Sequence, residues 1–232
     1  MNGGNTTRGC MKRLKEEIAG ELEYRILSQI YGTGERLPSE RDLAVEFSVS
    51  RPVVHEALLI LEGRGLISLR PRHGALVNDF REKGTIDLLS TLLLHRGEED
   101  GNGPLLSSLY RARALLESDA AKLACLYGSE NDWDRLEELM GFGESLSDPR
   151  SMALRDFSIH HYIARVSGNI VYPLLINSLK PVYLEYLKGF YLKKGDSYEI
   201  RDLQKKLLDA FRRGNSDMAE AIMRELSSYT LE

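Results

Sequence analysis

The spacing of apolar residues predicts an amphipathic helix near the start of the chain, over residues 12–30. Five aliphatic residues recur there at every fourth position, which places them along one face of a helix. They are Leu14, Ile18, Leu22, Ile26 and Ile30. We expect this face to pack against the following elements, and Gly32 and Gly34 to end the helix. Residues 1–11 are polar and glycine-rich, which predicts a disordered tail.

Residues 34–66 have the pattern of two short amphipathic helices joined by a tight turn. Ser39 precedes the first helix, where its hydroxyl can accept an amide hydrogen bond, and Asp42 favours a helix N-terminus. The turn at residues 48–50 ends on Ser50, which can cap the second helix near Arg51. The apolar positions expected to be buried are Leu43, Ala44, Phe47, Val53 or Val54, Ala57, Leu58 and Leu61. This arrangement predicts a helix-turn-helix.

Two short apolar segments, residues 66–69 and 75–77, flank a basic tip that contains Gly74. This pattern predicts a β-hairpin, so the whole unit is a winged helix. The start of the second helix would enter a DNA major groove, where Arg51 can contact a guanine edge. The arginines at positions 41, 70 and 72 are expected to contact phosphates. The candidate DNA-binding residues are Arg41, Ser50, Arg51, His55, Arg70, Arg72, His73 and Gly74.

The rest of the chain is predicted to be helical. A polar, charged stretch at residues 79–84 is the expected linker, and residues 85–232 should form a second domain of about seven helices. The predicted breaks between helices are at 97–104, 128–129, 147–149, 168–169, 195 and 214–215. The fold class is therefore mostly α, with a winged helix-turn-helix at residues 12–78 and an all-α domain after the linker.

Length and charge agree with two domains. The chain has 232 residues, 42% of them hydrophobic, which is enough for two cores. The net charge of -4 excludes a uniformly basic nucleic-acid protein. Residues 1–78 carry 11 Lys/Arg against 10 Asp/Glu, and the remainder 20 against 25. A field that attracts DNA must therefore come from local clusters of arginine.

Other features lead us to expect an intracellular protein and give little support for an enzyme. Cys10 and Cys125 are too few and too far apart for a disulfide framework, which suits a reducing cytosol. We find neither a signal peptide nor an apolar run long enough to span a membrane, so we expect a cytoplasmic protein. The sequence contains no glycine-rich phosphate-binding loop, no Gly-x-Ser-x-Gly motif and no His-Glu-x-x-His motif. The best enzyme alternative is a metal hydrolase that uses Asp156, His160 and His161.

The predicted winged helix-turn-helix at residues 12–78, which we call the reading head, resembles the GntR family of bacterial transcription regulators. The matching positions are Gly34, Leu37 to Arg41, Leu43-Ala44, Val49 to Arg51, Glu56 to Leu58, Leu61-Glu62 and Gly65 to Ile67. One departure is His55, where the family usually has arginine, and it suggests a different operator preference. The resemblance implies a homodimer on a pseudo-palindromic operator.

The second half resembles the effector domain of the FadR subfamily. Its Arg-x-x-x-Glu-x-x-Ala-Ala helix corresponds to Arg113, Glu117 and Ala120-Ala121, and its central helix to residues 156–160. In many members the positions of Asp156 and His160 join two histidines in a metal site. Here Gln204 and Leu226 stand where those histidines would fall. Two ligands rarely hold a metal against water, so we expect a hydrogen-bonded pair and no cofactor.

The fatty-acid-responsive FadR proteins also lack these two metal-binding histidines, and residues 167–180 resemble the corresponding segment of those proteins. We therefore expect an acyl-CoA or fatty acid as effector. Its acyl chain would lie in an apolar cavity, and its charged head group would contact Arg113 or Lys180. The candidate effector-binding residues are Arg113, Asp156, His160, Leu175, Leu179, Lys180, Tyr183 and Leu226. The alternative is a small carboxylate bound with a divalent metal on Asp156 and His160.

Overall fold

The computed structural model describes residues 4–89, 91–92, 104–143 and 146–229. The chain divides into two compact units, residues 1–95 and 96–232. Each is described by itself. In the described part of the chain, no helix combines the length and the apolar character that crossing a membrane requires.

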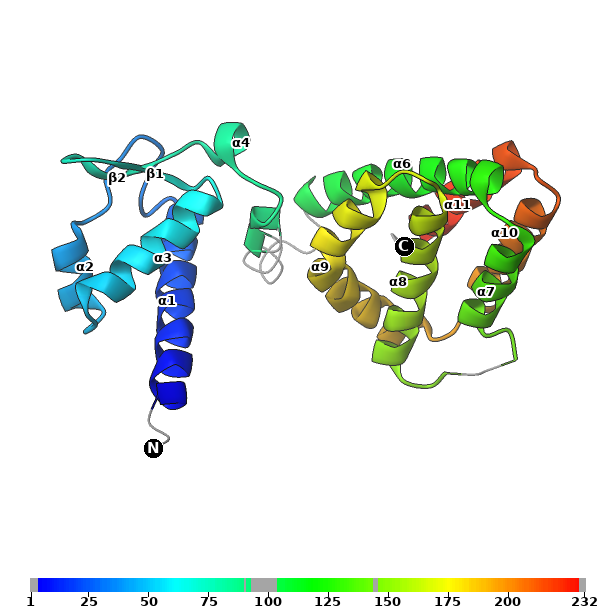
Figure 1. The fold of residues 1–232 in the computed structure, drawn as a ribbon, viewed down its shortest axis with the longest axis horizontal. Coiled ribbons are helices and arrows are strands. Elements are labelled where there is room, and N and C mark those ends of the chain that lie inside the picture. Colours follow the sequence, from blue (N-terminus) through cyan, green and yellow to red (C-terminus); the bar gives the residue numbers. More distant parts are fainter. Residues whose placement is uncertain (1–3, 90, 93–103, 144–145, 230–232) are drawn as a thin grey trace. The chain divides into compact units, whose positions relative to one another are not determined.

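The first unit begins with the long helix α1, Gly4–Leu27 (Figure 1). Ile18, Leu22 and Ile26 are buried, as the four-residue spacing predicts. Two expectations were wrong. The segment expected to be a disordered tail belongs to α1 from Gly4 onward, which its sequence permits since it contains no proline. Ile30 lies beyond the end of the helix and is 60% exposed, since the chain turns through Gln29 at a φ of 60°.

The helix-turn-helix consists of α2, Glu40–Glu46, and α3, Arg51–Gly63. The amide of Asp42 donates to the hydroxyl of Ser39 at 3.2 Å, which confirms the predicted cap of α2. Ser50 occupies the N-cap position of α3, but its side chain makes no capping hydrogen bond. Its carbonyl accepts from the amide of Val53 at 3.0 Å instead, and Pro52 removes one amide from the first turn.

The wing is an antiparallel hairpin of β1, Ile67–Arg70, and β2, Gly74–Val77. Its register pairs Ile67 with Val77 and Arg70 with Gly74. Gly74 has a φ of 76°, a conformation open to glycine at little cost, whereas Arg72 in the same tip has a φ of 66°. The predicted winged helix-turn-helix is therefore present.

The segment predicted as the linker, residues 79–84, is part of the first unit. It forms the short helix α4, Phe80–Lys83. The amide of Thr85 donates to the carbonyl of Arg64 at 3.1 Å, and Leu88 is buried. The stretch is polar in sequence, yet these contacts hold it against the reading head. The division between the units therefore lies later than the predicted linker.

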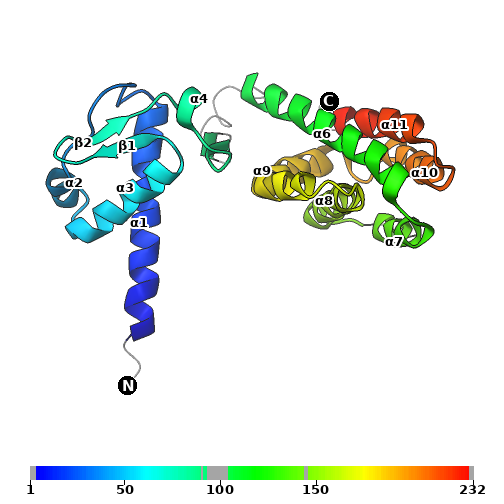
Figure 2. The same cartoon turned by 45° about the horizontal axis from the view of Figure 1, so that its top comes forward.

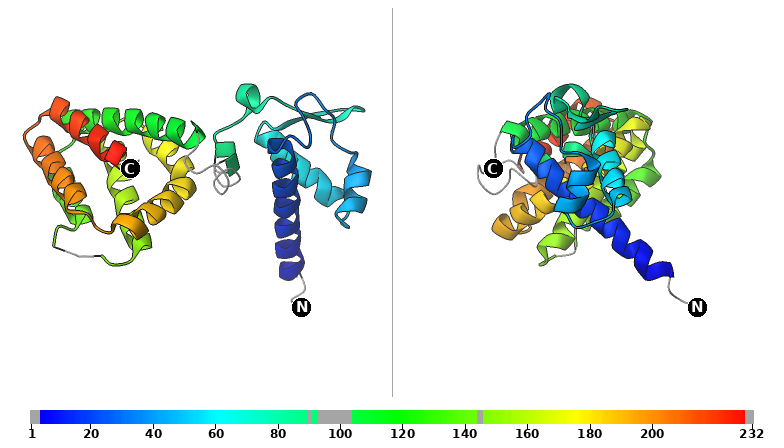
Figure 3. Two further views of the ribbon diagram at one scale, coloured as in Figure 1. Left: turned by 180° about the vertical axis from the view of Figure 1, so that it is seen from behind. Right: turned by 90° about the vertical axis from the view of Figure 1, so that its left-hand side faces the viewer.

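The second unit is all-helical (Figures 1 and 3). Its described helices are α6, Pro104–Tyr127; α7, Glu130–Met140; α8, Pro149–Val166; α9, Val171–Lys194; α10, Tyr198–Arg212; and α11, Ser216–Tyr229. The predicted breaks at Gly168, Gly195 and Gly214 are confirmed, and each glycine has a positive φ. Helix α7 ends early, because Gly141 caps it at a φ of 58°. Of the predicted break at 97–104, residues 97–103 lie outside the described residues, and Pro104 is the first residue of α6.

The core of this unit lies between helices that are distant in sequence. Helix α11 runs along α6, and α9 packs against α8 (Figure 2). Trp133 of α7 stacks on Phe211 of α10 with ring centroids 4.4 Å apart. Helices α6, α8, α9 and α11 also enclose a group of buried polar side chains, which forms the candidate effector site.

Candidate DNA-binding surface and effector site

The exposed side of α3 carries the predicted base-reading residues. Ser50, Arg51 and His55 are exposed, and Arg41 is exposed on the neighbouring α2. Nδ1 of His55 lies 2.8 Å from Oε1 of Glu40, the first residue of α2. Side chains on one face of a recognition helix can reach base edges in a major groove.

The wing supplies a second exposed group. Arg70, Arg72, His73 and Gly74 are all exposed at its tip. Two guanidinium groups on a narrow hairpin can contact phosphates on either side of a groove. All eight predicted DNA-binding residues therefore lie on exposed surface of the first unit, and their contacts with DNA stay a prediction.

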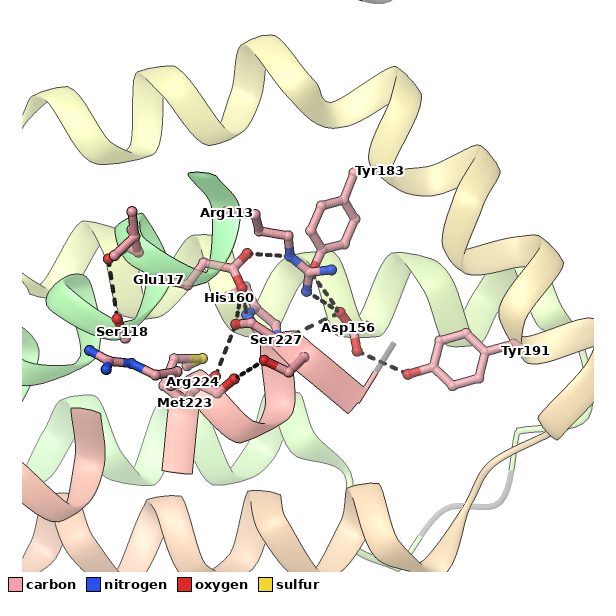
Figure 4. A network of polar contacts seen from close by, with 12 residues as sticks. Arg113, Glu117, Ser118, Asp156, His160, Tyr183, Tyr191, Met223, Arg224 and Ser227 are labelled. Carbon is pink, nitrogen blue, oxygen red and sulfur yellow. Dashed lines mark hydrogen bonds and ion pairs between the residues drawn. The ribbon is translucent and has the colours of Figure 1, made fainter. Parts of the chain in front are cut away.

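A buried polar cluster occupies the centre of the second unit (Figure 4). Arg113 of α6 donates from Nε to Glu117 Oε1 at 2.8 Å, and from Nη2 to the hydroxyl of Tyr183 at 2.5 Å. The same nitrogen is 3.8 Å from Oδ1 of Asp156. The Arg113 guanidinium also lies 4.1 Å from the centre of the Tyr183 ring. One guanidinium thus joins α6, α8 and α9.

Three more side chains, Tyr191, His160 and Ser227, complete this cluster. Tyr183 and Tyr191 of α9 donate to the two oxygens of Asp156 at 2.7 and 2.9 Å. Nδ1 of His160 is 2.8 Å from Glu117 Oε2, and its Nε2 is 3.6 Å from Asp156 Oδ1. Ser227 of α11 donates to the same oxygen of Glu117 at 2.7 Å. We call these seven residues the polar cluster: Arg113, Glu117, Asp156, His160, Tyr183, Tyr191 and Ser227.

Burial and neighbouring charge determine the protonation of the polar cluster. Burial by itself would raise the pKa of Glu117, but Arg113 and His160 beside it lower that pKa to about 2. Burial would lower the pKa of Arg113, but Glu117, Tyr183 and Asp156 raise it overall. The pKa values of Tyr183 and Tyr191 are raised, mainly by burial. At neutral pH the cluster therefore holds a guanidinium, a Glu117 carboxylate and two protonated phenols.

The residues present do not fit a divalent metal. Both oxygens of Asp156 accept tyrosine hydrogen bonds, and His160 faces Glu117. The two remaining positions of the suspected site are a neutral amide, Gln204, and an aliphatic side chain, Leu226, and both are buried. In the described ranges, no three His, Cys, Asp or Glu side chains are grouped as metal ligands.

A cavity adjoins the polar cluster between α6 and α9. It spans about 490 Å³ including the part open to solvent, and little of this space is wide enough for a water molecule. Tyr110 and Tyr186 pack edge to face beside it, with ring centroids 4.7 Å apart. The lining residues are Leu109, Tyr110, Arg113, Leu116, Glu117, Ile176, Leu179, Val182, Tyr183 and Tyr186. The cavity is therefore apolar, with a charged group at one wall.

Not all of the predicted effector residues meet at this site. Arg113, Leu179 and Tyr183 line the cavity, and Asp156 and His160 belong to the polar cluster. Lys180 is exposed, with Nζ 4.9 Å from the centre of the Phe157 ring. Leu175 and Leu226 are not among the lining residues. Lys180 points away because it follows Leu179 directly on α9, about 100° around the helix.

Sequence reasoning did not single out Glu117, Tyr191 and Ser227 as site residues. Glu117 had one local signal, its four-residue spacing from Arg113 on a helix, which brings the two side chains together. Tyr191 and Ser227 contact the polar cluster from α9 and α11. Nothing in the sequence close to Tyr191 or Ser227 indicated that these side chains would contact the polar cluster.

The second unit matches a model of the FCD domain over residues 108–228, and the first matches the model of bacterial regulatory proteins of the gntR family over residues 14–77. The transcriptional regulator Mce2R of Mycobacterium tuberculosis is 27% identical over 215 residues, 93% of this chain and 89% of that protein. The regulator LutR of Bacillus subtilis is 29% identical over 196 residues, 82% and 87% of the two chains.

The fold is also similar to solved structures. The Listeria monocytogenes protein Lar, which controls expression of the agr system, has a TM-score of 0.55 and 17% identity. The similarity covers 93% of this chain and 94% of that one. At this identity the likeness concerns the fold alone.

Proposed function

Since this chain belongs to the GntR family of bacterial regulatory proteins and has an FCD domain, we propose that an acyl compound bound in the second unit controls its operator binding. The chain is a DNA-binding transcription regulator and not an enzyme. The effector, its placement near the fatty-acid-responsive FadR proteins and the homodimer are our proposals.

The apolar cavity beside Arg113 is the observation that carries the acyl proposal. Leu109, Leu116, Ile176, Leu179 and Val182 supply aliphatic walls. Each methylene group buried against such walls contributes roughly 0.8 kcal/mol. The cavity is narrow, so a long chain must separate α6 from α9 or leave its far end outside. Separation of α6 from α9 would change the packing of the helices that enclose the polar cluster, and this would give binding a route to a conformational change.

The charge of the polar cluster favours an uncharged acceptor at the head of the ligand. The carboxylate of Glu117 already balances the single guanidinium of Arg113, and the carboxyl group of Asp156 lies 3.8 Å from the same guanidinium. A further carboxylate, supplied by a ligand, would add negative charge to a buried site, which is costly unless a proton is taken up. A thioester carbonyl can accept a hydrogen bond from Arg113 without changing that balance. This argument favours an acyl thioester over a small free carboxylate.

We further propose that two copies bind one operator. A single winged helix contacts few base pairs, and a second copy doubles the sequence that is read. The expected operator is a pseudo-palindrome. Light scattering at micromolar concentration should give the mass of two 26.2 kDa chains. A monomeric mass with one protein per operator would contradict this proposal.

Calorimetry on the full chain tests the effector. Acyl-CoA thioesters of increasing length should bind with rising affinity, and EDTA should leave that affinity unchanged. Leu179→Trp fills the cavity wall and should weaken long-chain binding. Leu174→Trp places the same side chain at a position of α9 that is 63% exposed, and should bind as the unaltered chain does.

Three results would overturn the acyl proposal. One is loss of binding in EDTA, which would support the metal-dependent alternative. The second is equal affinity for acetyl-CoA and a long-chain thioester. The third is an equal effect of Leu179→Trp and Leu174→Trp. A gel shift of the selected operator, with and without the thioester, then shows whether the ligand changes DNA binding.

A further inference from the structure

A buried hydroxyl, that of Tyr110, belongs to the wall of the apolar cavity in the second unit. Tyr110 is on α6, and only 5% of it is exposed. Its phenol oxygen is buried, and within the described residues no side chain or backbone group forms a hydrogen bond with it. Burial of a hydroxyl without a partner is costly, and native structures seldom leave one in this state. An unpaired hydroxyl on a cavity wall therefore indicates a place where a ligand supplies the missing partner.

The neighbours of Tyr110 keep its phenol protonated. Tyr186 of α9 packs edge to face against the Tyr110 ring, with centroids 4.7 Å apart. Burial, above all, raises the pKa of Tyr110. Tyr186 adds to this increase, although its hydroxyl does not meet that of Tyr110 in hydrogen-bond geometry. At neutral pH the Tyr110 hydroxyl is therefore a donor that an oxygen atom in the cavity can accept from.

Arg113, at another point of the cavity wall, is close to this hydroxyl along the helix. The two residues are three positions apart on α6, so their side chains are neighbours on one face of the helix. Their separation along the helix axis is roughly 4.5 Å. A ligand whose carbonyl meets Arg113 would therefore place a group only a few bonds further along its chain beside Tyr110.

We propose that the effector is an acyl thioester with an oxygen on its chain close to the thioester, as in β-hydroxyacyl and β-ketoacyl compounds, and that Tyr110 binds this oxygen. The inference rests on the proposed function, because it takes the acyl chain to occupy the cavity and its carbonyl to meet Arg113. A hydroxyl or keto oxygen adds no charge to the buried site, and its bond to Tyr110 offsets the cost of its own burial. A plain chain would leave the phenol unpaired, so the site would discriminate against it.

Calorimetry on the full chain compares decanoyl-CoA with its β-hydroxy derivatives of both hands and with its β-keto derivative. All have the same chain length, so they differ only in the added oxygen. At least one oxygenated thioester should bind about tenfold more tightly than decanoyl-CoA, the value of one buried hydrogen bond. A keto oxygen only accepts hydrogen bonds, whereas a hydroxyl also donates, so the tightest ligand identifies the oxygen that the site takes.

Tyr110→Phe removes the hydroxyl and keeps the ring. It should weaken binding of the preferred oxygenated thioester about tenfold and bind decanoyl-CoA at least as tightly as the unaltered chain, so that the preference disappears. Tyr127→Phe is the matched control. Tyr127 is on the same helix, is 70% exposed and is not among the cavity-lining residues, so the preference should stay.

The stability of the ligand-free chain gives a second readout. Because the Tyr110 hydroxyl has no hydrogen-bond partner in the described part of the protein, Tyr110→Phe should not lower the urea midpoint measured by Trp133 fluorescence. A midpoint lowered more than in Tyr127→Phe would show that the hydroxyl has a partner within the protein, and this result overturns the inference.

The binding outcomes distinguish the inference from the proposed function. If none of the thioesters binds, the acyl proposal fails and the inference fails with it. If decanoyl-CoA binds and an added oxygen of either kind leaves the affinity unchanged, the acyl proposal stands and the inference is wrong. A preference for the oxygenated ligand that survives in Tyr110→Phe also overturns the inference, because another group would then bind the oxygen.

Discussion

The hydroxyl of Ser227, on α11, donates a 2.7 Å hydrogen bond to Oε2 of Glu117, on α6, the first described helix of the second unit (here also called the effector unit). The two residues are separated by 110 positions, and both are buried. Glu117 also accepts from Arg113. The contact therefore joins α11 to the charged centre of the domain, and it makes α11 part of the polar cluster.

Replacing Ser227 with alanine should lower the free energy of unfolding by about 1 to 2 kcal/mol, because a buried carboxylate loses a donor. Urea unfolding followed by fluorescence measures this change. Trp133 of α7 is the chain's single tryptophan, so its signal comes from the effector unit. Ser228→Ala is the matched control, since Ser228 is exposed and bonds only the carbonyl of Arg224 among the described contacts. Equal effects of both variants would contradict the role given to Ser227.

The effector unit should lose stability in acid. The pKa of Glu117 is about 2 in the folded chain against an ordinary value of 4.5. Because the folded pKa is the lower one, its stabilising contribution is complete above pH 4.5 and is lost as the pH falls toward 2. The loss is roughly 3 kcal/mol for this one group. Urea midpoints from Trp133 fluorescence at decreasing pH measure it.

Glu117→Gln is the control for the acid effect. It should be less stable at neutral pH, because Arg113 stays buried with one partner fewer. Its stability should fall less steeply with acid, since one titrating carboxylate is missing. A parallel decline in the variant and the unaltered chain would show that other carboxylates account for the acid sensitivity.

Gly65→Ala should destabilise the reading head by at least about 2 kcal/mol. Gly65 has a φ of +78°, and an added Cβ would lie 1.8 Å from the carbonyl oxygen of Lys83. Gly63→Ala is the matched control, because nothing lies within 4 Å of its Cβ position, and it should stabilise α3 by up to about 1 kcal/mol. Circular dichroism should report the loss, while Trp133 fluorescence stays unchanged. A loss shared by both variants would contradict the clash.

Arg51 and Arg72 should have different effects on DNA binding. Arg51→Ala should cost about 1 to 3 kcal/mol and relax specificity at one base of each half-site. Arg72→Ala should weaken binding to all sequences alike and reduce its dependence on salt. Gel shifts with the selected operator and with random DNA, at several salt concentrations, separate the two effects. Equal losses on both DNAs for Arg51→Ala would contradict base reading.

The sequence by itself determined the elements that follow local rules. The cap at Ser39, the glycines that end helices and the hairpin around Gly74 all depend on residues close together in the chain. These signals were sufficient for a winged helix followed by an all-α domain. They also placed Arg113, Asp156 and His160 near one site, through spacing on helices and through family resemblance.

Only the tertiary structure decided where polar segments and buried partners lie. The charged stretch at 79–84 reads as a linker, but Thr85 and Leu88 attach its end to the head. Ser227 contacts Glu117, and Glu40 contacts His55, because folding brings α11 to α6 and α2 to α3. Such pairs depend on how helices pack, and the periodicity of one helix contains no information about which residues another helix places opposite it.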